Sequence, residues 1–166
     1  SIVAEVRRMT ADGVKEVNLI AQDITAYGAD RDDGARLESL LRELVKIEDL
    51  HWLRLLYAYP DGISDELIEL IASEEKICNY LDIPLQHVDD AILKQMNRRV
   101  DEATIRGLIR RLRERIPELT LRTSFIVGFP GETEEQFAKL HEFVNEGHFE
   151  RVGVFRYSRE EGTSAA

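Results

Sequence analysis

Extended apolar runs alternate with amphipathic helical stripes along the whole of this 166-residue chain, and that alternation restricts the fold more than any other feature. The extended runs begin near residues 16, 52, 80, 119 and 151. Their spacing of about 30 to 40 residues suits right-handed βαβ crossovers, which need a helix between parallel strands. We therefore expect an α/β fold with strands over residues 16–21, 52–58, 80–86, 119–127 and 151–157.

A helical stripe precedes the first strand, and helical stripes follow each of the first four strands. Ser64 is a candidate N-cap, and Thr133 with Gln136 three residues later forms a candidate capping box. Gly13 and Gly147 are placed to end helices. Five βα units fall short of the eight units in a full barrel of about 250 residues. A partial TIM-like barrel of parallel βα units and an open doubly wound sheet both remain possible.

Polar residues share one face of the predicted strands, which distinguishes these two folds. A parallel strand covered on both faces is an almost continuous run of Val, Ile and Leu. Here one face is polar, with side chains two or four residues apart on a strand: Asn18 and Gln22, Asp82 and Gln86, Arg122 and Ser124. This pattern favours a curved sheet whose inner face is solvated or holds a ligand. The alternative is a structural ion network in which Arg54, Asp82 and Arg122 pair with each other.

Motifs with turn residues follow several strands at the edge where parallel α/β folds bind ligands. Residues 126–133 (IVGFPGET) combine glycines with a helix N-terminus, although they could equally be a simple turn. Residues 81–87 (LDIPLQH) include a proline, which loses a sheet hydrogen bond and suggests an irregular strand end. We expect Gln86 and His87 at this edge, His87 as a capping or core residue.

The composition limits the kinds of binding partner and the cellular compartment that we expect. The chain has 22 basic and 32 acidic residues, a net charge of −10, which weighs against bulk binding of nucleic acid. No apolar run approaches the roughly 20 residues of a membrane span, and no signal peptide is visible. The single cysteine, Cys78, allows no intrachain disulfide and resembles a small buried apolar residue. We expect a cytoplasmic protein. No two histidines have metal-ligand spacing, and no catalytic triad, P-loop or dinucleotide motif is present.

Several stretches together resemble one known family in the correct order. They are residues 18–23, 57–71 (YAYPDGISDELIELI), 81–87, 92–99 (ILKQMNRR), 126–133 and 157–163 (YSREEGT). The resemblance is to the methylthiotransferases of the radical S-adenosylmethionine (SAM) superfamily. It is closer to the branch that modifies an aspartate of a small-subunit ribosomal protein (RimO type) than to the branch that modifies adenosine in tRNA (MiaB type).

The resemblance implies a six-stranded partial barrel with SAM bound across the C-terminal rim of its strands. By position, Gln22 and Asp23 would stand near the methionine end of SAM. Gln86 and Ser124 would lie near its ribose. The adenine would contact four consecutive residues: Ile126, Val127, Gly128 and Phe129. The partner would be a ribosomal protein, with nucleic acid unlikely as the direct substrate and no membrane involved.

One departure from the family concerns the catalytic 4Fe-4S cluster. The superfamily holds it with a CxxxCxxC loop, whereas this chain has Cys78 alone. We therefore expect residues 1–166 to be a single radical SAM core domain that lacks the first barrel strand, the cluster loop and the flanking N- and C-terminal domains. Such a chain would be inactive by itself and could self-associate through its unpaired first strand. A cluster-free α/β binding scaffold is the alternative of another class.

Overall fold

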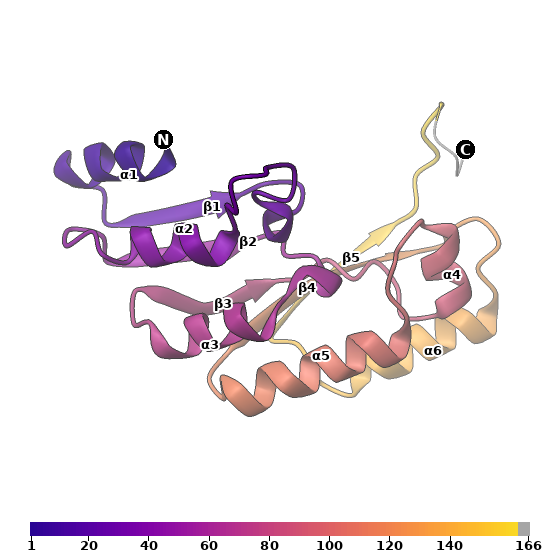
Figure 1. Cartoon of the computed structure of the whole chain (residues 1–166). Coiled ribbons are helices and arrows are strands. Elements are labelled where there is room, and N and C mark those ends of the chain that lie inside the picture. Colours follow the sequence, from indigo (N-terminus) through magenta and orange to yellow (C-terminus); the bar gives the residue numbers. More distant parts are fainter. Residues whose placement is uncertain (163–166) are drawn as a thin grey trace.

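The structure is a computed structural model that describes residues 1–162; Thr163, the last residue of the 157–163 motif, lies outside them. Five strands form one parallel sheet in the order β1-β2-β3-β4-β5. They are β1 (Glu16–Ile20), β2 (Trp52–Leu56), β3 (Ile77–Asp82), β4 (Thr120–Val127) and β5 (Arg151–Arg156). The predicted parallel α/β fold is confirmed. Because the strand order never reverses, this sheet is not doubly wound and progresses in one direction, as in a barrel (Figure 1).

Helices connect the strands at the predicted places. They are α1 (Ile2–Ala11), α2 (Leu37–Leu44), α3 (Asp65–Ser73), α4 (Asp90–Gln95), α5 (Glu102–Arg115) and α6 (Glu134–Asn145), with 3-10 turns η1 (Ile24–Ala26) and η2 (Pro60–Gly62). Ser64 Oγ accepts the Leu67 N–H at 3.0 Å, and Thr133 and Gln136 form both bonds of the capping box. Both predicted N-caps are confirmed.

The third strand differs from its predicted range of 80–86. It begins at Ile77 and ends at Asp82, because Pro84 has no N–H to continue the ladder. Beyond Asp82 the chain still follows β4. Ile83 N–H donates to the Arg122 carbonyl at 2.9 Å, and Gln86 N–H donates to the Ser124 carbonyl at 2.9 Å. The end of the predicted strand is therefore an irregular extension that stays hydrogen-bonded to β4, as the proline indicated.

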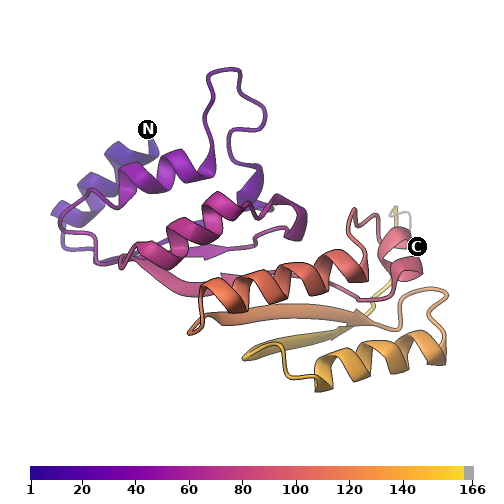
Figure 2. The ribbon, with the colours of Figure 1, turned by 60° about the horizontal axis from the view of Figure 1, so that its bottom comes forward.

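One face of the sheet carries the core. Helices α2, α3, α5 and α6 lie along this face (Figure 2). Leu55, Leu81, Leu121 and Phe125 are buried beneath them, and the Phe125 ring packs edge-on against Phe143 of α6 with centroids 6.3 Å apart. The opposite face, which we call the open face, carries polar side chains: Asn18, Arg54, Tyr80, Asp82, Arg122 and Ser124. The predicted separation of polar and apolar faces is therefore confirmed.

Ion pairs on the open face differ from the predicted three-residue network. Arg122 Nη1 donates to Asp82 Oδ1 at 2.6 Å, as expected. Arg54, in contrast, pairs with Glu16 across β1 and β2, with its Nε 2.8 Å from Glu16 Oε1. Its guanidinium also lies 5.1 Å from the Tyr80 ring centroid. The expectation that all three residues pair with each other is wrong, because Glu16 is the acid closer to Arg54.

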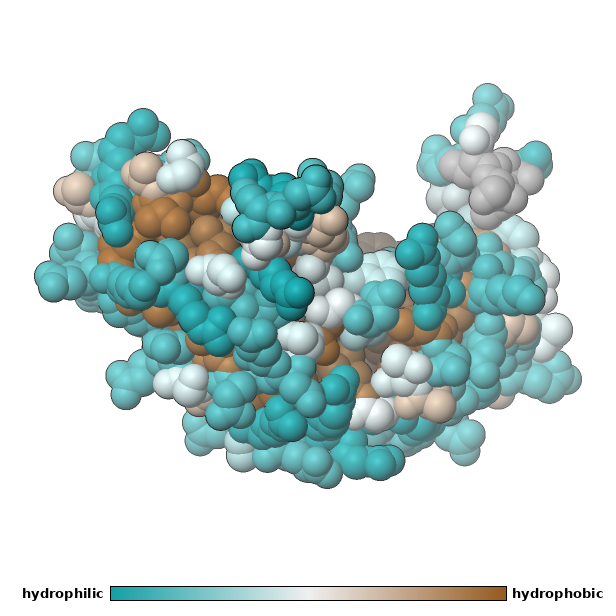
Figure 3. Space-filling view, viewed as in Figure 1, coloured by the Kyte–Doolittle hydropathy of each residue, from teal (hydrophilic) through white to brown (hydrophobic). Residues whose placement is uncertain are grey.

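The two edge strands of the described sheet are β1 and β5. Apolar surface gathers over α1 and β1 (Figure 3), where Ile20 is 64% exposed. Self-association through this edge stays a prediction. Cys78 is half-buried on β3, and burial raises the pKa of its thiol despite the nearby Arg54 cation. Within residues 1–162, no helix has the length and apolarity needed to cross a membrane.

Candidate functional site

The carboxyl ends of the parallel strands form a rim that contains a cavity of about 400 Å³. Ligand sites in proteins commonly have volumes in this range. Three predicted site residues meet there, Gln86, Ile126 and Phe129, together with Tyr59 and the segment 95–98 that follows α4. The structure therefore brings the end of β3 and the end of β4 to one ligand-sized hollow.

Gln86 has an unusual backbone conformation at this rim. Its φ of 70° lies in the left-handed region, which costs a residue with a side chain about 1 kcal/mol or more. The strain is compensated by two bonds to β4, since Gln86 N–H donates to Ser124 and the Gln86 carbonyl accepts the Ile126 N–H at 2.8 Å. No bond within residues 1–162 engages the Gln86 side chain. Its amide is therefore available to a ligand in the cavity.

Arg98 provides a positive charge in the same cavity. Its guanidinium carbon lies 4.7 Å from the Tyr59 ring centroid, and it forms no ion pair with any of residues 1–162. Asn97, with φ 56°, turns the chain after α4, and Arg98 N–H donates to the Leu93 carbonyl at 2.8 Å. A guanidinium held on an aromatic ring with free donors suits a carboxylate. The sequence analysis assigned neither Tyr59 nor Arg98 a role in the site, although they belong to the 57–71 and 92–99 motifs.

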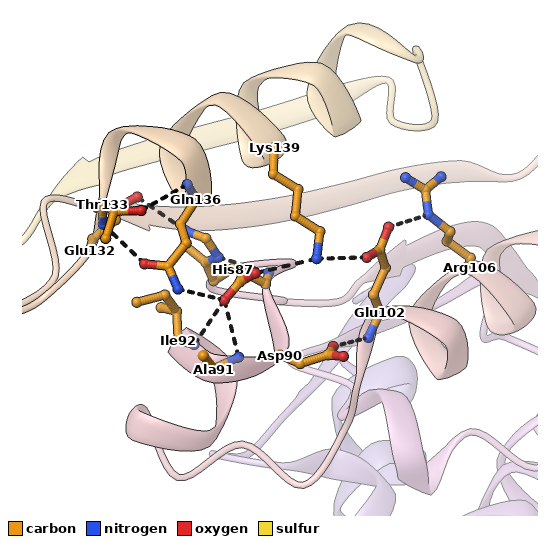
Figure 4. A network of polar contacts seen from close by, with 11 residues as sticks. His87, Asp90, Ala91, Ile92, Glu102, Arg106, Glu132, Thr133, Gln136 and Lys139 are labelled. Carbon is orange, nitrogen blue, oxygen red and sulfur yellow. Dashed lines mark hydrogen bonds and ion pairs between the residues drawn. The ribbon is translucent and has the colours of Figure 1, made fainter.

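Glu132 holds the backbone of the loop after β4. Its side chain is 4% exposed, and its Oε2 accepts the Phe129 N–H at 3.2 Å and also the Gly128 N–H. His87 Nε2 donates to Glu132 Oε1 at 3.1 Å, while His87 Nδ1 accepts the Asp89 N–H at 2.9 Å (Figure 4). Because Nδ1 is an acceptor, the ring proton is on Nε2. His87 is fully buried, which confirms the core alternative of its expected role, while the N-cap of α4 is Asp89.

The contacts continue from this loop to three helices (Figure 4). Asp89 caps α4 and accepts the Gln136 Nε2–H at 2.9 Å, and Lys139 bridges Asp89 at 3.3 Å and Glu102 at 2.9 Å. Arg106 then joins Glu102 to Glu146. Burial opposes ionisation of Asp89, but the Ile92 N–H and Lys139 outweigh it and lower its pKa. The network fixes α4, α5 and α6 relative to the rim.

The Arg106–Glu146 pair predicts an acid-sensitive contribution to stability. Hydrogen bonds from Arg106 lower the pKa of Glu146 from 4.5 to about 2; burial opposes this shift and His148 adds to it. A lowered folded-state pKa gives stability that is present above about pH 4.5 and lost as the pH falls through about 2. Since the side chain is 35% exposed, solvent screening reduces the effect to about 1 kcal/mol.

Urea unfolding of the chain at pH 5 and near pH 2 measures this contribution. Between these two pH values, the free energy of unfolding of the wild type should fall by about 1 kcal/mol more than that of Glu146→Gln. Glu142→Gln, an exposed acid on the same helix, is the control and should follow the wild type. A difference between wild type and Glu146→Gln that stays constant with pH would contradict the assignment.

The remaining predicted site residues are distributed around the rim. Gln22 is exposed just after β1, and Asp23 caps η1 by accepting the Thr25 N–H at 2.9 Å. Asp23 also lines a separate cavity of about 390 Å³. Ser124 is buried on the open face, and Gly128 is exposed with φ 74°.

Val127 lies on the helix-covered face. It lines a small apolar cavity with Phe125 and Leu140, so its side chain does not reach the rim cavity.

The profile of the Radical SAM superfamily matches residues 1–144, which is most of the chain. The chain belongs to the radical SAM superfamily. It is 76% identical over all 166 residues to the ribosomal protein uS12 methylthiotransferase RimO of Syntrophotalea carbinolica, and 63% identical over 165 residues to that of Geotalea uraniireducens. The chain spans 36% and 37% of the lengths of these two relatives.

Solved structures of radical SAM proteins share the fold. The methyltransferase TsrM from Kitasatospora setae, with cobalamin and a [4Fe-4S] cluster bound, aligns with a TM-score of 0.75 at 20% identity over 96% of this chain and 31% of that protein. Coproporphyrinogen III oxidase HemN from Escherichia coli aligns with a TM-score of 0.63 at 18% identity, over 95% of this chain and 37% of HemN.

The radical SAM superfamily implies SAM and a 4Fe-4S cluster, and the residues of this chain fit the two groups differently. The rim cavity combines a guanidinium, amides and apolar side chains, which match the carboxylate, ribose and adenine of SAM. Across residues 1–162, no three His, Cys, Asp or Glu side chains are grouped to hold a metal. The chain therefore fits SAM and does not provide the cluster ligands.

Proposed function

We propose that this chain is the SAM-binding core of an enzyme that adds a methylthio group to the β-carbon of an aspartate in ribosomal protein uS12. The observation that carries the proposal is the 76% identity to RimO over the entire chain. Because the chain spans only 36% of that relative, the activity belongs to a larger protein. In this proposal residues 1–166 are one core domain, and the cytoplasmic parent adds the first barrel strand, the cluster loop and flanking domains.

The rim residues would divide the contacts to SAM among them. Gln86 and Ser124 would bind the ribose, while Ile126, with Phe129, would cover the adenine. Arg98 would bind the methionine carboxylate. At the adjacent end of the rim, Gln22 and Asp23 would face the methionine end of SAM. The backbone of Val127 and Gly128 would border its adenine.

When bound, SAM and the cluster supply the one-electron chemistry that activates a C–H bond. The residues of this chain would bind SAM, orient its adenosine against the open face and shield the site from water. Since Cys78 is the only cysteine, the cluster ligands would come from the part of the parent outside this chain. The isolated chain should therefore not cleave SAM.

The proposal is tested with the full-length, cluster-reconstituted protein that contains this chain. We expect it to methylthiolate a uS12 peptide with the target aspartate, as judged by mass spectrometry, and to leave tRNA unmodified. Modification of tRNA instead would favour the tRNA branch. Absence of both reactions together with absence of SAM cleavage would favour a cluster-free binding scaffold.

Gln86→Ala should weaken binding of S-adenosylhomocysteine about tenfold, because one hydrogen bond contributes roughly 0.5–1.5 kcal/mol. The Gln86 side chain has no bond within the described chain, so the melting temperature should stay close to that of the wild type. Calorimetric titration of the full-length protein measures the affinity. An unchanged affinity would remove Gln86 from the SAM site.

A further inference from the structure

Three charged residues form a row across the open face, one layer inside the rim. In the sheet register, Asp82 of β3 lies beside Arg122 of β4, which lies beside Arg151 of β5. Arg122 precedes Ser124 by two residues and Ile126 by four on the same face. Two residues along a strand span about 7 Å, so the row lies directly below the residues proposed to hold the adenosine.

Asp82 holds Arg122 in one orientation and accepts from only one of its three guanidinium nitrogens. The Asp82 side chain is 4% exposed and accepts from Arg122 Nη1, whereas the Arg122 side chain is 35% exposed toward the open face. The Nε and Nη2 groups of Arg122 donate no hydrogen bond within residues 1–162. A planar guanidinium offers five N–H donors and suits a bidentate carboxylate. Arg122 is therefore oriented with most of its donors free.

Gly153 of β5 lies beside these free donors. Gly153 is paired with Ser124 in the register, and a Cβ at this position would lie 3.3 Å from the Phe155 ring and 3.9 Å from Arg122 Nη2. Its φ is not in the positive range, so the backbone does not require a glycine here. A glycine in a strand interior often marks a place where a ligand approaches closely. Gly153 is on the β5 side of Arg122, whereas Asp82 is on the β3 side.

The charges of the open face leave room for one more carboxylate. Three arginines, Arg54, Arg122 and Arg151, face the two acids Glu16 and Asp82. Arg151 is exposed and forms no ion pair within residues 1–162. An incoming acidic side chain would therefore meet an excess of positive charge.

We propose that Arg122, on the open face beside Gly153, binds the carboxylate of the aspartate that the enzyme modifies and so determines its specificity for aspartate. This inference rests on the proposed function. The carboxylate carbon of aspartate is bonded directly to the β-carbon, so an anchored carboxylate places the reacting carbon one bond away. Asp82 is a positioning residue that holds Arg122, and Gly153 leaves the neighbouring position on β5 without a side chain of its own.

The test compares two uS12 peptides, with Asp or Asn at the modified position, binding to the full-length enzyme loaded with S-adenosylhomocysteine. We expect the wild type to prefer the Asp peptide by about tenfold or more, as for a hydrogen-bonded charge pair. Arg122→Gln should abolish this preference and leave the affinity for S-adenosylhomocysteine unchanged. Arg122→Lys should give an intermediate preference, because it keeps the charge and loses the fork.

Arg54→Gln is the matched control, since it removes the same charge from the same face and leaves the Asp82–Arg122 pair intact. It should keep the preference for Asp. Gly153→Val adds a β-branched side chain, which strands favour, next to Arg122 Nη2 and the Phe155 ring. It should weaken binding of the Asp peptide and spare binding of S-adenosylhomocysteine. If Arg122→Gln fails to fold because Asp82 is left unpaired, the Asp82→Asn/Arg122→Gln double variant replaces it.

A purely structural ion pair would give another result. Peptide affinity, S-adenosylhomocysteine affinity and melting temperature would then fall together, and the Asp-to-Asn ratio would not change. That outcome, or an unchanged preference in a folded Arg122→Gln, would overturn the assignment. A wild-type enzyme that binds SAM but neither binds nor modifies the Asp peptide would overturn the proposed function, and this assignment with it.

Discussion

Replacing Glu132 with alanine should lower the free energy of unfolding by about 3 kcal/mol. The Glu132 side chain is 4% exposed and accepts hydrogen bonds from His87 Nε2 and from the backbone of Gly128 and Phe129. Each donor left without a partner away from water costs roughly 1–3 kcal/mol. Of the three donors, His87 is fully buried and has no access to water as a substitute. Urea denaturation monitored by circular dichroism measures the loss.

Glu134→Ala provides the control for this variant. Glu134 is an exposed acid in the first turn of α6, two residues after Glu132, so its removal should cost only a few tenths of a kcal/mol. A loss for Glu132→Ala as small as that of the control would contradict the role assigned to the buried carboxylate.

Glu132→Gln tests the tautomer of His87. A glutamine amide can turn either its oxygen or its NH₂ group toward His87, and the other end then faces the Gly128 and Phe129 N–H groups. If the NH₂ group faces His87, the ring must move its proton to Nδ1, which would then oppose the Asp89 N–H. Both arrangements leave donors facing donors. Glu132→Gln should therefore recover less than half of the stability that Glu132→Ala loses.

The order of elements could be predicted because it depends on local signals. Apolar periodicity identified the strands, and the capping sequence at Thr133 fixed the start of α6. The proline at position 84 indicated an irregular end of β3, but the last residue of the strand, Asp82, could not be predicted, because the extension beyond it is still held by bonds to β4. The partner of Arg54 was also inaccessible, since only the register of β1 against β2 brings Glu16 to it.

The candidate site was predictable where it consists of contiguous motifs at strand ends. Gln86, Ile126 and Phe129 were identified in this way, and they meet in one cavity. Arg98 escaped detection because its position depends on the left-handed turn at Asn97, which carries the chain back over Tyr59. Glu132 resembled an ordinary acid near a helix start, and only burial against His87 distinguishes it.

Replacing Arg98 with alanine should weaken the affinity for S-adenosylhomocysteine by about 10- to 100-fold. A hydrogen bond to a charged group contributes roughly 1.5–3 kcal/mol, and Arg98 is the cation proposed to bind the methionine carboxylate. The effect should be large because the guanidinium is already oriented on the Tyr59 ring and has no acidic partner within residues 1–162 to release. Calorimetric titration of the full-length protein measures the change.

Arg99→Ala is the matched control for Arg98→Ala. Arg99 is the next residue, carries the same charge and is exposed outside the cavity, so its removal should change the affinity less than twofold. Arg98→Lys should recover part of the loss, because it retains the charge but not the planar fork.

A second ligand separates carboxylate binding from a general distortion of the rim. 5′-Methylthioadenosine has the adenosine of SAM and lacks the carboxylate, so Arg98→Ala should leave its affinity unchanged. Gln86→Ala, in contrast, should weaken the binding of both ligands, since the contact proposed for Gln86 is to the ribose that both of them contain. If Arg98→Ala lowered the affinity for both ligands equally, Arg98 would support the cavity wall and would not bind the carboxylate.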